Sequence, residues 1–292
     1  MMMNEQQVRG IFIPAITPFT EDGQLDTDSF HKYISYLARH DIQGLVINGT
    51  TGESPTVQWD EVKEMIQLTR DILTKLDKNI PIVVGTGTND TYTTVKRTEL
   101  AAELGVDAAM VVTPYYNKPT QQGIQEHFRK VAEVGLPVIV YENPARTGCR
   151  ITVDTMRSIM EHDSVIGLKD SSGGIELMSA LLKHETKPIL CGDDAYFHAM
   201  LCQGAAGGLL ASANIHPQRF IEVYERFVSG DVFGSRDLFK PLVSIIHHLY
   251  EEPASATLKW WLADQRIITN EQLRLPLVPA TDSVKQRLLS VI

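Results

Sequence analysis

The sequence predicts an α/β fold, a (β/α)8 (TIM) barrel with an extra helical segment toward its C-terminal end. Eight short apolar runs alternate with longer amphipathic segments, and most of these runs are apolar at successive positions. Strands that are buried on both faces have this pattern, because helices cover both sides of a parallel sheet. The length of 292 residues fits one large barrel domain with a surplus. A doubly wound sheet is the competing architecture.

The expected strands are short aliphatic runs, the first of which reads GIFIPAIT. They cover residues 10–17, 44–49, 81–87, 108–114, 137–143, 165–170, 188–194 and 207–213. The doubly wound sheet is disfavoured because its dinucleotide-binding signature is weak here. The sequence GTGTND has two glycines but lacks the third, and no GxxxxGK[ST] motif occurs.

The segments between the strands have helical spacing. In the first of them, Phe30, Ile34 and Leu37 share one face, and Asp26 or Thr27 is an expected N-cap. Glycine tolerates the left-handed conformation that ends a helix, and helices should end at Gly105, Gly135 and Gly204.

The chain after the eighth strand, residues 215–292, has the pattern of several further helices. One of them closes the barrel, and the apolar faces of the others need cover from the barrel or from another subunit. We therefore expect residues 1–225 to form the barrel and residues 226–292 to form a C-terminal helical appendix.

Composition limits the classes of function. The formal net charge of -9 argues against a broad basic surface for DNA or RNA. Three cysteines without a CxxC motif make neither a disulfide framework nor a zinc site. The N-terminal residues do not resemble a signal peptide, and no apolar run approaches the roughly 20 residues of a membrane helix. We expect a reduced cytoplasmic protein.

The carboxyl ends of the strands should contain the chemistry, as in other barrels of this type. These ends have no histidine and no HExxH motif, so we expect neither a metal site nor a Ser–His–Asp triad. Asp193 and Asp194 could bind a hard cation, although two adjacent acids more often cap the helix that follows. The remaining candidates for chemistry at the strand ends are one lysine, one arginine, several tyrosines and threonine hydroxyls.

Lys169 ends the apolar run VIGLKD, where an ammonium group is seldom found without a partner or a task. Burial favours the neutral form of an amine, and a neutral amine attacks a ketone to form a Schiff base. Tyrosine hydroxyls suit the proton transfers that follow. The spacing leaves a second explanation equally open, in which Lys169 merely pairs with Asp170 or a neighbouring acid.

Four motifs at the strand ends resemble those of the pyruvate-dependent class I aldolases, a family that includes dihydrodipicolinate synthase and N-acetylneuraminate lyase. The resemblance covers the whole chain, and together the motifs are highly specific. They are NGTTGES (48–54), TPYYNKP (113–119), YENPARTG (141–148) and GLKDSSG (167–173).

The resemblance implies roles for individual residues. Lys169 resembles the Schiff-base lysine, and Tyr141 resembles the tyrosine that serves as general acid and base beside the imine. Thr50 and Tyr116 resemble its partners in a proton relay, with Tyr116 supplied by the neighbouring subunit of a tight dimer. No cofactor is implied, because pyruvate itself forms the covalent imine on the lysine.

The pyruvate pocket is also implied by the resemblance. Thr51, with the backbone amides of the GTTG loop, resembles the cradle of the pyruvate carboxylate. Gly192 and Leu209 match positions whose backbone lines the pocket. Taken singly, these features have plainer explanations, since tyrosines at strand ends are often core residues and both threonines could be turn residues.

Arg146 discriminates between members of the family. It resembles an arginine that holds the carboxylate of L-aspartate 4-semialdehyde, and a guanidinium fork binds a carboxylate bidentately. We therefore expect condensation of pyruvate with that semialdehyde, a step toward lysine and diaminopimelate. The alternatives are an aldolase for 2-keto-3-deoxy sugar acids or N-acetylneuraminate, and a non-catalytic regulatory paralogue.

Glu142 departs from the pattern, because asparagine usually follows the catalytic tyrosine. A carboxylate there could repel an acidic substrate, or it could point outward into an interface.

A lysine-binding effector site occurs in some members, and Ser54, Asn89 and Tyr115 match it. Three further positions of that site, often histidine, histidine and glutamate, are here Trp59, Val62 and Thr93. We predict weak or absent inhibition by lysine, because the acid that would pair with its ammonium group is missing. The family is commonly a dimer of dimers, so we expect a homotetramer with small-molecule substrates and no nucleic-acid or membrane partner.

Overall fold

The structure is a computed structural model that describes residues 2–292. Its eight strands follow one another in chain order as a closed barrel, which confirms the predicted fold class. The pair β1–β2 and the pairs from β3–β4 to β7–β8 are parallel. The strands are β1 (Gly10–Pro14), β2 (Gly44–Ile47), β3 (Ile82–Gly85), β4 (Ala108–Val112), β5 (Val138–Glu142), β6 (Val165–Asp170), β7 (Ile189–Cys191) and β8 (Gly207–Leu209).

The chain divides into two compact units, which are described in turn. The first comprises the residues up to Gly10 together with Pro81–Leu209, and the second comprises Ile11–Ile80 together with Leu210–Ile292. The predicted boundary between residues 225 and 226 stays a prediction, and one helix, α9 (Pro217–Val228), runs across it.

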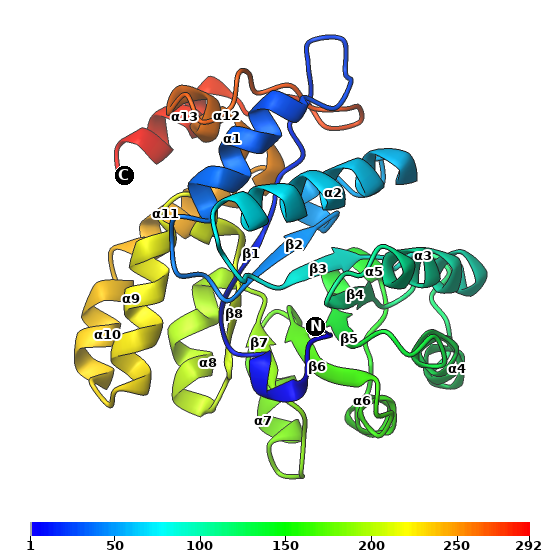
Figure 1. The fold of residues 1–292 in the computed structure, drawn as a ribbon. Helices are drawn as coiled ribbons and strands as arrows, with labels where there is room; N and C mark the ends of the chain where they lie inside the picture. Colours follow the sequence, from blue (N-terminus) through cyan, green and yellow to red (C-terminus); the bar gives the residue numbers. More distant parts are fainter. Residues whose placement is uncertain (1) are drawn as a thin grey trace. The chain divides into compact units, whose positions relative to one another are not determined.

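The first unit contains β3 to β8 and the helices that connect them. Figure 1 shows α3, α4 and α6 on the outer side of β4 to β6. As predicted, Gly105, Gly135 and Gly204 follow helices with positive φ angles of 68°, 83° and 108°. The helices are η1 (Glu5–Gln7), α3 (Thr91–Glu103), α4 (Gln121–Ala132), α5 (Pro144–Thr147), α6 (Val153–Met160), α7 (Glu176–Leu181), η3 (Asp194–Tyr196) and α8 (Phe197–Gln203).

The register between β5 and β6 determines which of the candidate side chains in the first unit share a face of the sheet. Tyr141 lies opposite Lys169, and Glu142 lies opposite Asp170. Successive side chains of a strand point to opposite faces of the sheet, so Tyr141 and Lys169 share one face and the two acids share the other.

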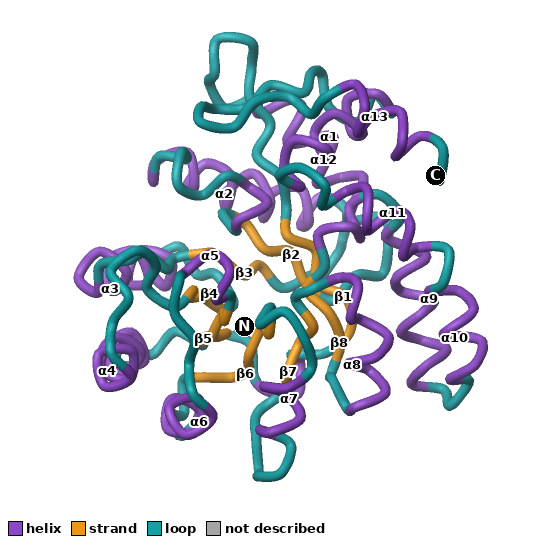
Figure 2. Tube along the Cα trace, turned by 180° about the vertical axis from the view of Figure 1, so that it is seen from behind, coloured by secondary structure: helices purple, strands orange, loops and turns teal. Residues whose placement is uncertain are grey.

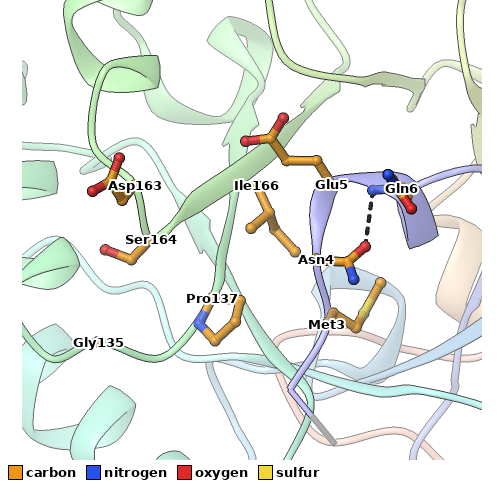
Figure 3. Close-up of a pocket in the computed structure, with 9 residues that line it drawn as sticks. All are labelled: Met3, Asn4, Glu5, Gln6, Gly135, Pro137, Asp163, Ser164 and Ile166. Atoms are coloured by element: carbon orange, nitrogen blue, oxygen red, sulfur yellow. Dashed lines mark hydrogen bonds between the residues drawn. The ribbon is translucent and has the colours of Figure 1, made fainter.

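A hollow of about 760 Å³ lies at the amino ends of β5 and β6 (Figure 3). The N-terminal segment with Met3 and Asn4 forms one wall, and Pro137, Asp163 and Ser164 form the other. Because Asp163 and Ser164 precede β6 whereas Lys169 lies near its carboxyl end, this hollow is distinct from the predicted site.

The second unit contains β1, β2 and the C-terminal helices. Asp26 caps α1 as predicted, because its carboxylate accepts a hydrogen bond from the Ser29 N–H at 2.9 Å. Helices α9 and α10 lie side by side (Figures 1 and 2). The helices of this unit are α1 (Thr27–Leu37), η2 (Thr50–Gly52), α2 (Trp59–Lys75), η4 (Ala211–Asn214), α9, α10 (Val232–Phe239), α11 (Leu242–Leu249), α12 (Ala254–Asp264) and α13 (Asp282–Leu289).

Candidate active site

Lys169 lies buried on the same sheet face as Tyr141. Its Nζ atom is 4.0 Å from the centroid of the Tyr141 ring, and only 7% of the residue is exposed. The Tyr141 hydroxyl accepts a hydrogen bond from Asn143 Nδ2 at 2.8 Å. Within residues 2–292, Lys169 forms no ion pair. Simple pairing with Asp170, the second explanation of the sequence, is therefore not what the structure shows.

Gly192 packs directly against the Lys169 side chain. A Cβ atom at this position would lie 2.8 Å from Lys169 Cε and 2.2 Å from Ser171 Oγ, so only glycine fits without displacing them. The Gly192 N–H donates to the Asp170 carbonyl at 2.8 Å, which fixes this backbone beside β6. Leu209, the last residue of β8, is buried.

The side chain of Asp193 does not cap the helix that follows it. Asp193 occupies the N-cap position of η3 without a capping hydrogen bond from its side chain. Its carboxylate instead accepts from the Gly173 N–H at 2.8 Å, and burial raises its pKa although the nearby charge of Lys169 acts in the opposite direction.

Potential metal ligands gather elsewhere in the described part of the chain. The ligand atoms of His247, His248 and Glu251 lie within 4.8 Å of one another near the end of α11. Glu251 is already paired with Arg287 and His248, which lower its pKa to about 2.

Glu142 faces away from Lys169 and is buried. Its Oε2 atom accepts from Thr113 Oγ1 at 2.9 Å, and its Oε1 atom accepts from the Ile151 N–H at 3.0 Å. Burial raises the pKa of this carboxyl group. Of the two placements expected from the sequence, the outward one is correct, but the carboxylate binds other residues of its own chain.

Asp170 is the second buried acid on the sheet face that points away from Lys169. Its Oδ1 atom accepts from the Ser172 N–H at 2.9 Å, whereas Oδ2 has no partner. Burial raises its pKa above the usual 3.8, the charge of Asp193 adds to the effect, and Arg150 opposes it.

The loops after β4 and β5 contain Tyr116 and Arg146. Tyr116 is 86% exposed and has a φ angle of 70°, a left-handed conformation that is uncommon for a bulky residue. Arg146 lies in the four-residue helix α5 and is exposed. Gln121 ties the end of this loop to α4 by accepting from the Thr152 N–H at 2.9 Å and donating to the Arg150 carbonyl at 2.8 Å.

The Thr50–Thr51 turn belongs to the second unit, where it forms η2. Thr51 is buried, and the Gly52 carbonyl accepts from Thr17 Oγ1 at 2.7 Å. Glu53 ends the turn in a left-handed conformation, with a φ angle of 58°.

A buried ion pair between Glu53 and Lys259 holds this turn, and the sequence analysis missed it. Both side chains are almost completely buried, and Lys259 also donates to the Gln272 carbonyl at 2.8 Å. Burial lowers the pKa of Lys259 to about 8, against the opposing effect of Glu53. A lysine within the apolar run LKWWLA is the same signal that singled out Lys169, and it could have marked Lys259 as a buried lysine, although not Glu53 as its partner.

The candidate effector residues are divided between the two units. In the first unit, the Asn89 carbonyl accepts from Asn117 Nδ2 at 2.7 Å. Tyr115 lies in the loop of Asn117, after β4, and is half-buried. Thr93 donates its backbone N–H to Asp90 at 2.7 Å. In the second unit Ser54 is half-buried and Val62 is fully buried.

No helix of the described residues is long and apolar enough to cross a membrane.

Comparison with known proteins gives one consistent result. The model of the dihydrodipicolinate synthetase family matches residues 7–292. The chain is 34% identical over 285 residues to 4-hydroxy-tetrahydrodipicolinate synthase 2 of Clostridium acetobutylicum, covering 97% of this chain and 98% of that protein. It is 38% identical over 276 residues to 4-hydroxy-tetrahydrodipicolinate synthase of Ralstonia nicotianae, covering 94% and 92%.

Solved structures agree with the sequence comparison. Dihydrodipicolinate synthase from Thermotoga maritima superposes with a TM-score of 0.93 at 32% identity, covering 98% of this chain and 97% of that one. The chloride-inhibited enzyme from Acinetobacter baumannii in complex with pyruvate gives a TM-score of 0.92 at 31% identity, covering 97% of each chain.

We predict that Asp170→Asn changes stability in a pH-dependent way. The folded state raises the pKa of Asp170 above 3.8, so the folded protein binds this proton more tightly than the unfolded chain. This contribution to stability is complete at low pH and is lost as pH rises from about 3.8 through the folded pKa. The neutral amide avoids that loss, so the unfolding free energy of the variant, relative to wild type, should increase between pH 4 and pH 8.

Urea unfolding at several pH values measures this difference. The matched control is Asp154→Asn on α6, because the Asp154 side chain is 96% exposed. Its difference from wild type should be independent of pH, and a flat or falling curve for Asp170→Asn would contradict the prediction.

Proposed function

The chain belongs to the dihydrodipicolinate synthetase family of lyases, which need no cofactor, and we propose that it condenses pyruvate with L-aspartate 4-semialdehyde through an imine on Lys169. The observation that supports this most directly is the buried Lys169 amine, which lies over the Tyr141 ring and pairs with no acid in residues 2–292. An acid at ion-pair distance would hold a proton on the amine and prevent attack on a ketone.

The first half-reaction uses pyruvate. Lys169 Nζ attacks the keto carbon, the tetrahedral adduct loses its oxygen as water, and a protonated imine forms. Loss of a proton from the methyl carbon then gives an enamine. Tyr141 is the proposed acid and base for these steps, because its hydroxyl is hydrogen-bonded and its ring contacts the lysine. Thr51 and the backbone amides of its turn are the proposed cradle for the carboxylate, and Gly192 and Leu209 line the pocket.

The second half-reaction uses the semialdehyde. The enamine carbon attacks the aldehyde carbon, whose oxygen takes up a proton, and the amine of the substrate then displaces Lys169 to give the cyclic product. Arg146 is the proposed partner of the substrate carboxylate. It is exposed, and no acceptor within residues 2–292 engages its guanidinium group, so that group is free to bind an anion.

The proton relay extends the site beyond one chain in this proposal. Thr50 and Tyr116 link Tyr141 to solvent, with Tyr116 contributed by a second copy in a homotetramer built as a dimer of dimers. The 86% exposure of Tyr116 supports this role, since an exposed tyrosine can reach a neighbouring subunit. The proposed setting is lysine and diaminopimelate biosynthesis in the cytoplasm.

Borohydride trapping tests the imine. We expect the wild-type chain, treated with pyruvate and borohydride, to gain the mass of one reduced pyruvate on the peptide that contains Lys169. Lys169→Ala should gain nothing, while Lys130→Ala, which removes an exposed lysine of α4, controls for labelling elsewhere. Mass spectrometry of the digested protein gives the position, and an unmodified wild-type Lys169 would contradict the proposed mechanism.

Arg146→Ala tests the second substrate. Removing a charge-assisted hydrogen bond costs roughly 1.5–3 kcal/mol, so kcat/KM for the semialdehyde should fall about 10- to 100-fold. The trapped pyruvate imine should be unchanged. Arg157→Ala on α6 is the control for loss of a surface arginine. Full activity of Arg146→Ala, or turnover of a 2-keto-3-deoxy sugar acid in preference to the semialdehyde, would refute the choice of substrate.

Inhibition by lysine should be weak or absent. Trp59, Val62 and Thr93 provide no carboxylate for the ammonium group of an effector, and Val62 is fully buried. A dose–response assay at saturating pyruvate measures this property. Inhibition at sub-millimolar lysine would show the prediction to be wrong, and Thr93→Glu tests whether an added acid strengthens the response.

A further inference from the structure

Glu142 is the residue that the proposed mechanism leaves without a role. It directly follows Tyr141 in β5, yet it points to the opposite face of the sheet because strand side chains alternate. It is 1% exposed, so it is a buried acid immediately beside the reaction centre. A buried carboxylate is costly unless its oxygens are hydrogen-bonded.

The carboxylate of Glu142 bridges two loops. Thr113 Oγ1 donates to its Oε2 atom at 2.9 Å, and the Ile151 N–H donates to its Oε1 atom at 3.0 Å. Thr113 immediately follows β4 and begins the loop that contains Tyr116. Ile151 follows α5 and ends the loop that contains Arg146. One side chain therefore fixes both substrate-facing loops to the end of β5.

Arg146 depends on its backbone for its position. Its helix, α5, has four residues, and its guanidinium group is engaged by no acceptor in the described chain. On one side the loop is anchored by Asn143, whose Oδ1 atom accepts from the Arg146 N–H at 3.2 Å. On the other side it is anchored by the Glu142–Ile151 bond and by Gln121.

We propose that Glu142 is a positioning residue that sets the place of Arg146 and thereby the affinity for the carboxylate of the second substrate. The inference rests on the proposed function, because it assigns Arg146 to that carboxylate. Glu142 acts on Arg146 through the backbone at Ile151, and within residues 2–292 its carboxylate forms no ion pair with Lys169.

The bridge does not require the negative charge of Glu142. If Oε2 is protonated, it can donate to Thr113 Oγ1, whose own hydroxyl then donates to the Tyr141 carbonyl at 3.3 Å. Glutamine keeps the length and offers the same two contacts. Asparagine is one methylene shorter and cannot reach both Thr113 Oγ1 and the Ile151 N–H without backbone movement.

Glu142→Gln and Glu142→Asn form a matched pair that separates length from charge. We expect Glu142→Gln to keep the KM for the semialdehyde within about 2-fold of wild type, and Glu142→Asn to raise it roughly 5-fold, the central value for one lost hydrogen bond. The KM for pyruvate and the trapped imine should change in neither variant. Parallel changes in both KM values would indicate general loosening and overturn the proposal, as would equal effects of the two variants.

A double-mutant cycle with Arg146→Ala tests whether Glu142 acts through the arginine. If it does, Glu142→Asn should add little to the defect of Arg146→Ala, because the positioned group is already gone. Additive defects would overturn the proposal. If Glu142→Asn fails to fold, Glu142→Asp, which is shorter by the same methylene and keeps the charge, replaces it in the cycle.

The imine assay with the wild-type chain distinguishes failure of the proposed function from failure of the role proposed for Glu142. A wild-type chain that forms no imine refutes the proposed function, whereas a normal imine with additive defects refutes only the role of Glu142.

Discussion

The candidate site depends on the separation of one buried amine from the acids that lie nearest to it in the chain. Lys169 and Asp170 are adjacent, and Tyr141 and Glu142 are adjacent on the neighbouring strand. The pleat of parallel strands directs the lysine and the tyrosine to one face and both acids to the other. The amine therefore contacts an aromatic ring at 4.0 Å in place of a carboxylate. A register shift of one residue would reverse this arrangement and place an acid beside the amine.

Buried carboxylates also hold the loops that are proposed to bind the substrates. In the first unit, Glu142 joins the loops of Tyr116 and Arg146 through both of its oxygens. In the second unit, Glu53 follows the Thr50–Thr51 turn, pairs with Lys259 and accepts from the Arg274 N–H at 3.1 Å. Both acids lie one or two residues from a proposed catalytic or binding residue. Removing one partner from the Glu53–Lys259 ion pair would leave the other charge buried and uncompensated, which costs about 3–5 kcal/mol, so this pair holds the Thr50–Thr51 turn firmly.

The sequence predicted the features that depend on periodicity. Eight apolar runs became eight strands, and the glycines at 105, 135 and 204 follow helices because few other residues adopt positive φ at low cost. The orientation of Glu142, which the sequence analysis left open, could have been derived from the period of two along β5 once Tyr141 was assigned to the inner face. The Glu53–Lys259 pair could not be derived in the same way, because 206 positions separate residues whose contact depends on tertiary packing. Apart from β6, which covers the whole of its predicted run, the strands are shorter than the runs, since the last residues of those runs turn away to form loops.

The conformation of the Tyr116 loop places a physical demand on the proposed relay. Tyr116 and Lys118 both have positive φ angles, 70° and 47°, and such conformations cost of order 1–3 kcal/mol each for residues other than glycine. A loop keeps that strain only where surrounding contacts over-determine it. Within the first unit, the Asn117–Asn89 hydrogen bond supplies part of this restraint. This hydrogen bond does not cover the side chain of Tyr116, which stays exposed. Burial of the Tyr116 ring against a second copy of the chain would offset the free-energy cost of the strained backbone. In the proposed mechanism, subunit assembly and proton transfer therefore both depend on Tyr116.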